Sequence, residues 1–320
     1  MSLEKSVEGE CKPRIVLVGA GRWGSVHART VKEAGGVLAA VVDVRREAAE
    51  RVARMHGARA YASLDEAVEG EELDAAIVAV PPSSLAAVAR EALEHGLHVL
   101  VEKPVALDSG SVEELAGLAS SRGLVAIAGY LLRFHPLTRL LAGYARGGGL
   151  TRVELYRVVG RPGYARSWPI DYDLAVHDID LALYLLGGDA RVLEARLVER
   201  GEGQAFELLL EAGEGARVYI YASDAVEEGV KYRVVRVFAH RGILEAYYDE
   251  NVAVVRGGGV RKVVVEGEKP LTLEHRAFYS LVCGSSLESV EERLGARPAS
   301  LGEAARVLRV VEEARRKALG

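Results

Sequence analysis

The amino-acid sequence predicts an α/β protein organised in two parts. In the first part, short apolar runs rich in β-branched residues alternate with helical segments, which is typical of βαβ units and of a parallel sheet with helices on both faces. In the second part, strand-like runs follow one another with turn residues between them, which indicates antiparallel strands. The length of 320 residues agrees with two domains of roughly 100–200 residues each.

The first part alternates strands and helices in a regular order. Apolar runs predict strands, in order, at Arg14–Val18, Val37–Val42, Ala75–Val80, Val99–Val101 and Val125–Ala128. Helices are predicted between them at Ser25–Ala34, Arg46–His56, Asp65–Glu69, Ser83–His95 and Ser111–Arg122. Gly35 and Gly36 end the first helix, and Pro81 and Pro82 end the third strand, because proline lacks the amide donor that a central strand needs.

The pattern changes near residue 150. We expect a strand at Arg152–Val159, a helix at Asp173–Leu186, and two closing helices at Thr272–Cys283 and Ser300–Leu319. At least six strand-like runs lie between Arg191 and Glu266, including Phe206–Glu211, Arg217–Ala222, Tyr232–His240 and Lys262–Glu266. The second part is therefore predicted to contain an antiparallel meander, with the domain boundary near Gly129–Leu132.

Composition and charge exclude several functional classes. With 27% charged and 49% hydrophobic residues, the composition is that of an ordinary globular protein. The net charge of −5 provides no global basic field for nucleic acid. The longest apolar stretch, Leu124–Leu132, is well short of the ~20 residues that a membrane-spanning helix requires. We therefore expect neither a nucleic-acid partner nor a membrane segment.

The N-terminus and the two cysteines bear on localisation. Met1–Pro13 carries several charges and no apolar core, so we interpret it as a disordered leader rather than a secretory signal. Cys11 and Cys283 are far apart in the sequence and lack metal-type spacing, which argues against a disulfide scaffold. We expect reduced cysteines, no bound metal and a cytoplasmic protein.

A glycine-rich loop joins the first predicted strand to the first predicted helix. It reads Gly19-Ala20-Gly21-Arg22-Trp23-Gly24. Gly19 permits the tight turn, Gly21 lets the backbone approach a pyrophosphate, and Gly24 allows close helix packing. The helix N-terminus adds free N–H groups and a partial positive charge for the phosphates. The loop therefore predicts a dinucleotide-binding site.

An acidic residue follows at the end of the second predicted strand. Asp43 lies 19 residues after Gly24, where a ribose-binding carboxylate is expected, and a carboxylate repels a 2′-phosphate. Arg45 and Arg46 come next and could instead receive that phosphate, or could be solvated residues at a helix start. The sequence favours NAD and leaves NADP open as an alternative.

A lysine follows the fourth predicted strand, in the sequence Glu102-Lys103-Pro104. Ligands of open parallel sheets bind outside the carboxyl ends of the strands, so Lys103 is expected to face the cofactor crevice. Pro104 fixes the backbone, and its peptide bond could be cis. The alternative is an ordinary surface lysine, which is less favoured because the chain has only eight lysines.

Asp173 and His177 are four residues apart in a predicted helix, so they would share a face within hydrogen-bonding reach. A carboxylate bound to one imidazole nitrogen would fix the tautomer and leave the other nitrogen as a base. The alternatives are a helix-capping Asp173 and a structural His177. A zinc site with Asp178 and Asp180 is not expected, because no second histidine or cysteine lies nearby in the sequence.

Taken together, these motifs resemble the Gfo/Idh/MocA family, named after glucose–fructose oxidoreductase, inositol dehydrogenase and a rhizopine-catabolism protein. The matching pieces are the glycine loop, Asp43, Val80-Pro81-Pro82, Glu102-Lys103-Pro104, Gly129-Tyr130, Arg133-Phe134-His135-Pro136, the helix from Asp173 to Leu186-Gly187, and Arg297-Pro298-Ala299-Ser300. The resemblance implies an α/β fold with an N-terminal Rossmann domain, a doubly wound parallel sheet, over residues 14–129. Residues 130–320 would form an α/β domain whose open, mostly antiparallel sheet binds substrate and forms a homodimer or homotetramer.

The resemblance also implies NAD(P)-dependent hydride transfer to or from a secondary alcohol of a sugar, inositol or nucleotide sugar. His177 would be the base, Lys103 would stabilise the alkoxide, and Asp173 would orient His177. The implied cofactor contacts are Gly19, Gly21, Arg22, Trp23, Gly24, Asp43, Arg45, Val80, Pro81, Glu102 and Lys103. The substrate contacts would be Lys103, Tyr130, Arg133, Trp168, Asp173 and His177, with Arg157, Arg161, Tyr164 and Arg166 as further candidates for the pocket.

Departures from the family pattern concern the substrate. Ala175 stands where the family often has glycine, and Leu131-Leu132 replaces an Asn or Arg. The string from Asp173 to Asp180 is similar to archaeal members identified as UDP-N-acetylglucosamine 3-dehydrogenases. Two rival functions share the fold: a non-catalytic dinucleotide-binding sensor, and a reductase for a non-sugar substrate, similar to biliverdin reductase or dihydrodiol dehydrogenase. Retention of Lys103 and His177 argues against the sensor.

Overall fold

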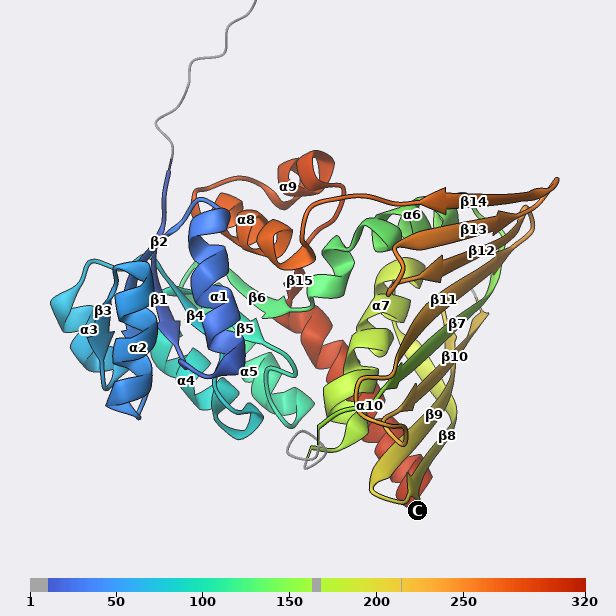
Figure 1. Cartoon of the computed structure of the whole chain (residues 1–320), viewed down its shortest axis with the longest axis horizontal. Coiled ribbons are helices and arrows are strands. Elements are labelled where there is room, and N and C mark those ends of the chain that lie inside the picture. Colours follow the sequence, from blue (N-terminus) through green and yellow to red (C-terminus); the bar gives the residue numbers. More distant parts are fainter. Residues whose placement is uncertain (1–10, 163–167, 214) are drawn as a thin grey trace, which may run out of the picture.

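The computed structural model describes residues 11–162, 168–213 and 215–320. Two sheets form the framework: one has helices on both faces, and the other is covered by helices on the face that points toward the first (Figure 1). The expected disordered leader falls mainly on residues 1–10, which lie outside the described residues. Within the described ranges, none of the helices is both long and apolar enough to cross a membrane.

The first sheet has seven strands in the order β15-β6-β5-β4-β1-β2-β3. Its strands are β1 (Arg14–Val18), β2 (Val37–Val42), β3 (Arg59–Tyr61), β4 (Ala75–Val78), β5 (His98–Glu102), β6 (Ala126–Gly129) and β15 (Ala299–Ser300). The helices between them are α1 (Arg22–Glu33), α2 (Arg46–His56), α3 (Leu64–Gly70), α4 (Pro82–Glu94) and α5 (Ser109–Ser121). Strands β1 to β6 run parallel, whereas β15 pairs with β6 in the antiparallel direction. The predicted doubly wound sheet is confirmed.

The second sheet has eight strands in the order β14-β13-β12-β11-β7-β10-β9-β8. These are β7 (Leu150–Val159), β8 (Ala190–Arg200), β9 (Gly203–Ala212), β10 (Ala216–Ser223), β11 (Lys231–Ala239), β12 (Gly242–Tyr247), β13 (Val252–Arg256) and β14 (Val260–Val264). Neighbours run antiparallel except β7 and β10, which are parallel. The expected mostly antiparallel sheet is confirmed.

The helices of the second part are η1 (Leu131–Phe134), α6 (Pro136–Ala145), the π-helical turn η3 (Asp171–Ala175), α7 (Val176–Leu186), α8 (Pro270–Val282), α9 (Leu287–Leu294) and α10 (Leu301–Leu319). Most of them lie between the two sheets, whereas α8 packs against α1 on the other side of the first sheet, with α9 beside it. Helix α10 starts with a capping box between Ser300 and Glu303 and runs from the first sheet to the far corner of the second (Figure 1). It contacts both α5 and β8, so it joins the two halves.

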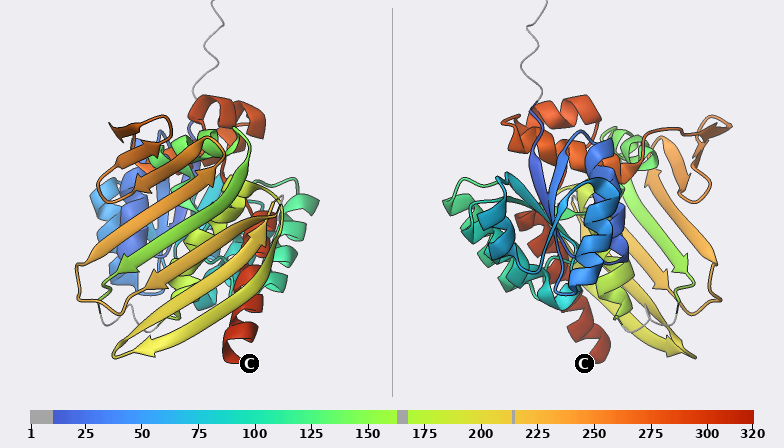
Figure 2. Two further views of the ribbon diagram at one scale, coloured as in Figure 1. Left: turned by 90° about the vertical axis from the view of Figure 1, so that its right-hand side faces the viewer. Right: turned by 60° about the vertical axis from the view of Figure 1, so that its left-hand side comes forward.

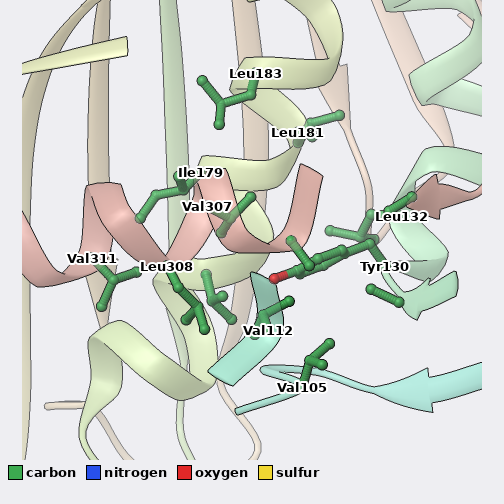
Figure 3. Close-up of a cluster of buried hydrophobic side chains, with 14 of the residues drawn as sticks. Val105, Val112, Tyr130, Leu132, Ile179, Leu181, Leu183, Val307, Leu308 and Val311 are labelled. Atoms are coloured by element: carbon green, nitrogen blue, oxygen red, sulfur yellow. The ribbon is translucent and has the colours of Figure 1, made fainter. Parts of the chain in front are cut away.

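The largest hydrophobic core is continuous between the two halves. Figure 3 shows side chains of α7 and α10, such as Ile179 and Leu308, close to Tyr130 and to Val105, which follows β5. A second cluster lies on the other side of the first sheet, where Phe278 and Tyr279 of α8 pack with β1 residues. Because α8 and β15 return to the first sheet, residues from 270 onward serve both halves.

The two cysteines form a disulfide, which corrects the expectation that both are reduced. Cys11 precedes β1 and Cys283 follows α8, and their Cα atoms are 6.1 Å apart although 272 residues separate them. Helix α8 packs against α1, beside β1, so the fold brings together two residues whose sequence spacing carried no such information. The cysteines therefore no longer support a reducing compartment.

Candidate active site

The glycine loop has the geometry that its sequence predicts. Gly19 has a φ of +102°, and a β-carbon there would collide with the Ala79 carbonyl. A β-carbon at Gly24 would collide with the Gly19 carbonyl, so Gly24 lets α1 pack against the turn. A β-carbon at Gly21 would meet nothing within 4 Å, which leaves the N-terminus of α1 open to a ligand.

Two neighbouring pockets lie along this loop, at the point where the strand order of the first sheet reverses. The larger, about 700 Å³, is lined by Val18, Gly19, Gly21, Arg22, Trp23, Val42, Asp43, Val44, Arg45, Ala79, Val80, Pro81, Ser84 and Val88. The smaller, about 360 Å³, is lined by Trp23, Ala79, Val80, Pro82, Glu102, Lys103, Leu131 and His177. The predicted cofactor residues therefore line the pockets, apart from Gly24, which packs behind the loop.

Asp43 supports the glycine loop from the end of β2. Its Oδ2 accepts a hydrogen bond from the Ala20 N–H at 2.8 Å, and its Oδ1 accepts one from the Arg45 N–H at 2.9 Å. The Arg45 side chain is 71% exposed and lies 3.5 Å from Asp43. A carboxylate oxygen can accept two hydrogen bonds. Oδ1 already accepts a second one from Arg45 Nε at 3.5 Å, so Oδ2 is the oxygen that retains capacity for a ribose hydroxyl.

Lys103 reaches across from the first half to the second. It follows β5, and the peptide bond between Lys103 and Pro104 is cis. The Lys103 Nζ donates to Asp173 Oδ1 at 2.6 Å and to the Asp173 carbonyl at 2.9 Å. This contact joins two residues that are 70 positions apart and places both beside the smaller pocket.

Asp173 does not bind His177, which corrects the expected pair. Its second oxygen, Oδ2, accepts a hydrogen bond from Arg161 Nη1 at 2.5 Å. Arg161 also donates to Asp224 Oδ2 through Nε at 2.9 Å and Nη2 at 2.5 Å. The expectation assumed a regular α-helix, whereas Asp173 lies in the π-helical turn η3, whose wider turn alters the angle between residues four apart.

Electrostatics around Asp173 favour its ionised form. Burial alone would raise the pKa of the Asp173 carboxyl, but the cations Lys103 and Arg161 outweigh burial and lower it below its usual value. The carboxylate therefore stays charged and holds the lysine and the arginine on opposite oxygens.

His177 is held as a neutral imidazole. Burial, together with the nearby cations Lys103, Arg157 and Arg233, lowers the pKa of His177 well below its usual value. No described residue bonds to its buried Nδ1. The Tyr130 ring and the imidazole are nearly perpendicular, with centroids 6.3 Å apart, and His177 lines the smaller pocket. A neutral imidazole that lines a pocket beside a lysine can accept a proton.

Several predicted substrate contacts have other positions. Arg133 is 1% exposed and binds Asp180 and Glu303, so it is part of a buried ion network, which corrects its assignment. Tyr130 is buried against His177 and is not among the residues lining the pocket. The Trp168 carbonyl accepts a hydrogen bond from Arg161, and Arg157 is paired with Asp178. Tyr164 and Arg166 lie outside the described residues.

Sequence reasoning missed several residues of the site. Asp224 anchors Arg161, and Leu131 and Pro82 line the smaller pocket. Nothing in the sequence distinguishes Asp224 from the many other acidic residues. Leu131 and Pro82 are apolar, so their residue types do not indicate a role in chemistry. The Leu131 position was noted only as a departure from a family pattern.

Comparison with known proteins agrees with this geometry. Residues 13–130 match the model of the oxidoreductase family with an NAD-binding Rossmann fold. Over these residues the chain is similar to the Gfo/Idh/MocA oxidoreductase family. Its first half is accordingly an NAD-binding Rossmann domain.

The chain is similar to two dehydrogenase sequences and to two solved structures. A UDP-N-acetylglucosamine 3-dehydrogenase of Acidithiobacillus ferrooxidans is 37% identical over 180 residues, so the match spans 55% of each chain, about half the relative's length. Inositol 2-dehydrogenase of Rhizobium meliloti is 26% identical over 75% of this chain and 77% of its own. The structure of the Acidithiobacillus ferrooxidans UDP-N-acetylglucosamine 3-dehydrogenase GnnA superposes with a TM-score of 0.84 and 26% identity, covering 96% of this chain and 98% of its own. GenD2 from gentamicin A biosynthesis, crystallised with NAD, has the same fold, with a TM-score of 0.81 and 23% identity over 100% of this chain and 97% of its own.

Proposed function

We propose that this protein is an NAD-dependent dehydrogenase acting on a secondary alcohol of a sugar, inositol or nucleotide sugar. The observation that carries the proposal is that Lys103, held by Asp173, and His177 both line the pocket that continues from the glycine loop. A base and a fixed cation at the nicotinamide end of a dinucleotide site are the groups that alcohol oxidation requires. The relatives named above act on such substrates, which supports the same class here.

In the proposed reaction, the glycine loop and Asp43 would hold NAD, which would supply the hydride acceptor for the carbinol carbon. His177 takes the hydroxyl proton, so the alcohol loses one proton and one hydride and becomes a carbonyl. Lys103 donates a hydrogen bond to the oxygen while negative charge develops on it. In the reverse direction, His177 returns the proton and the carbonyl is reduced.

The role of Asp173 differs from the one expected from the sequence. Because it binds Lys103 rather than His177, it holds the ammonium group beside the pocket. Arg161, itself fixed by Asp224, holds the other oxygen of Asp173. We therefore propose that Lys103 is positioned by a series of ion pairs that starts at the second sheet and passes through Asp224, Arg161 and Asp173.

A turnover assay tests the proposal. The purified protein is mixed with NAD or NADP and a panel of inositols, free sugars and UDP-sugars, and absorbance at the NADH band is followed. We expect reduction of NAD by at least one class and a preference for NAD, since Asp43 occupies the ribose-binding position. Tight NADH binding without turnover of any panel member would favour the sensor, and turnover of a non-sugar carbonyl alone would favour the rival reductase.

We also propose self-association through the outer face of the second sheet. In the left view of Figure 2 this face points toward the viewer, and none of the described helices lies over it. It carries Tyr156 and Tyr219, whose rings are 5.9 Å apart, and a ladder of ion pairs from Glu154 through Arg236 and Glu245 to Arg256. Half-exposed tyrosines beside ordered charges are typical of protein interfaces.

Light scattering at micromolar concentration tests the self-association. We expect a homodimer or homotetramer, and Tyr219→Glu should dissociate it because the charge would be buried without a partner. A monomeric wild-type protein would contradict the proposal. We further infer a cytoplasmic location, because NAD-linked metabolism draws on the intracellular dinucleotide pool; cell fractionation with NADH turnover as the marker tests it.

A further inference from the structure

A row of buried polar side chains lies behind the smaller pocket and has no part in the reaction proposed above. His27 of α1 and His275 of α8 are both completely buried. His27 Nδ1 lies 2.8 Å from His275 Nε2, although 248 residues separate them. His27 Nε2 lies 2.9 Å from Glu102 Oε1, and His275 Nδ1 lies 3.1 Å from the Tyr279 hydroxyl. Four side chains from three separate elements thus form one continuous hydrogen-bonded row.

The donors and acceptors of this row can be assigned. The Trp23 indole N–H, which can only donate, is bonded to Glu102 Oε1. Glu102 Oε2 accepts from the Lys103 backbone N–H at 3.2 Å, so both oxygens act as acceptors. His27 therefore donates through Nε2, and its Nδ1 accepts from His275. The Nδ1 of His275 then accepts from Tyr279, so every hydrogen bond of the row is directed toward Glu102.

Glu102 has little freedom to leave this position. It is 6% exposed and lines the smaller pocket with Trp23 and Lys103. A β-carbon at Gly129 would lie 3.1 Å from Glu102 Oε1, so glycine at that position makes room for the carboxylate. The same carboxylate accepts hydrogen bonds from the Trp23 indole and from the backbone N–H of Lys103, two residues that line this pocket.

Burial of two imidazoles is energetically unfavourable compared with burial of apolar side chains, because each buried polar group must be hydrogen-bonded. Burial, with a contribution from His27, lowers the pKa of His275 well below its usual value, so this ring stays neutral and keeps one donor and one acceptor. An apolar pair could fill the same space but could not orient Glu102. The arrangement is therefore explained by what it does for Glu102 rather than by packing alone.

We propose that His27 and His275 are positioning residues of the active site, which act through Glu102 on the Lys103 backbone and the Trp23 indole. This inference rests on the proposed dehydrogenase function, because Lys103 and the nicotinamide pocket have their roles there. Helix α8, which carries His275, follows the second sheet in the sequence, so the C-terminal part of the protein contributes to the cofactor half of the site.

The central test replaces His275 by leucine and by glutamine. His275→Leu removes the donor to His27 and should lower kcat by about 10- to 100-fold, the usual cost of losing a residue that orients a catalytic group. Substrate KM and NADH affinity should change little, because no contact of the row reaches the glycine loop apart from Trp23. His275→Gln keeps an amide donor that can reach His27, so it should recover most of the lost kcat.

A matched pair of tyrosine variants separates positioning from loss of a buried hydroxyl. Tyr279→Phe removes the end of the row and should lower kcat by about fivefold, the equivalent of one hydrogen bond. Tyr248→Phe removes a hydroxyl that is equally buried and is bonded to Thr138 Oγ1 at 2.7 Å, with no link to Glu102. It should lower the melting temperature and leave kcat unchanged.

The Trp23 indole supplies a readout that needs no substrate. The chain has two tryptophans, so in a Trp168→Phe background the emission comes from Trp23 alone. Energy transfer from Trp23 to bound NADH should fall in His275→Leu and be restored in His275→Gln. The two proposals can fail separately. If the wild-type protein turns over no substrate but His275→Leu still changes the Trp23 signal, the dehydrogenase function is refuted and the positioning of Trp23 by the histidines is kept.

The opposite results would overturn the positioning role. Unchanged kcat and unchanged Trp23 signal in His275→Leu, with only a lower melting temperature, would show that the histidines merely pack. If His275→Leu does not fold, Tyr279→Phe and Tyr248→Phe decide the matter. Equal kcat in these two variants would contradict the proposal, and a lower kcat in Tyr279→Phe alone would support it.

Discussion

The two ends of the cofactor pocket are built in different ways. The phosphate end is made by neighbours in the sequence, since Gly19, Gly21 and Arg22 belong to one turn between β1 and α1. The reacting end is made by residues that are 70 positions apart or more, such as Lys103 with Asp173 and His27 with His275. Cofactor binding should therefore survive changes that abolish the chemistry, because the two ends share few contacts.

The largest effect is expected for the base. His177→Ala should lower kcat by on the order of 10²–10⁴, while NADH affinity measured by calorimetry stays within a small factor of wild type. Part of the lost activity should return at high pH, where hydroxide can replace the imidazole. The matched control is His95→Ala, since His95 is bonded to Asp65 far from the pocket and should leave kcat unchanged.

We expect the same histidine to set the pH profile of the wild-type protein. Its pKa lies below the ordinary value of 6.5, so the imidazole is unprotonated and able to accept a proton at and below neutral pH. The kcat/KM for alcohol oxidation should therefore stay constant as pH falls to about 6.5 and decline only below it. A decline centred above pH 7 would show that another group is the base.

Loss of the lysine should have the next largest effect. Lys103→Ala should lower kcat by roughly 10²–10³, the usual cost of removing one group that stabilises developing charge, and leave NADH binding nearly intact. Lys269→Ala is the control, because Lys269 is 72% exposed and pairs only with Glu33 among the described residues. A fall in NADH affinity as large as the fall in kcat would contradict the separation of the two ends.

A smaller effect is expected where the second sheet supports the lysine. Asp224→Asn removes the charge that fixes Arg161, and through Asp173 it should lower kcat by about tenfold. Glu303→Gln is the control, because Glu303 binds Arg133 and Arg297 in a buried network away from the pocket. Equal kcat losses in the two variants would indicate general loosening rather than support of Lys103.

The control variant Glu303→Gln should also change how the melting temperature depends on pH. Burial alone would raise the pKa of Glu303, but Arg133, Arg297 and the Ser300 backbone lower it to about 2. A carboxyl with a lowered pKa stabilises the fold above its unfolded pKa of about 4.5 and loses that contribution as pH falls toward 2. Glu303→Gln should therefore lower the melting temperature at neutral pH and make it less sensitive to pH between 4.5 and about 2.

The smallest effect on chemistry is expected for the disulfide. Cys283→Ser or reduction should lower the free energy of unfolding by about 2–4 kcal/mol, because the bond closes a long loop in the unfolded chain. Both kcat and NADH affinity should stay the same at 25 °C, since Cys283 lies at the end of α8, outside both pockets. Thermal unfolding with and without reductant measures the change, and identical melting temperatures would contradict it.

The same contrast explains what the sequence could predict. The glycine loop, Asp43 and the strand and helix order of the first half, apart from β3, follow from local patterns. Strands β3 and β15 were not predicted, because three and two residues are too few to form a recognisable pattern. Lys103 and His177 were identifiable as residue types, but the partner of Asp173 was not, because the π-helical turn is not visible in residue spacing. Asp224, His275 and the disulfide partners depend on contacts over tens to hundreds of residues, which only the assembled fold supplies.

The most direct test of the account compares three proteins in one experiment. NADH is titrated by calorimetry into the wild-type protein, Lys103→Ala and His177→Ala, and each is then assayed for NAD reduction with the polyol, sugar and UDP-sugar panel. We predict similar NADH affinities in all three and turnover that is at least about 10²-fold slower in both variants than in the wild type. Turnover at the wild-type rate in either variant would contradict the central claim that Lys103 and His177 perform the chemistry beside the nicotinamide.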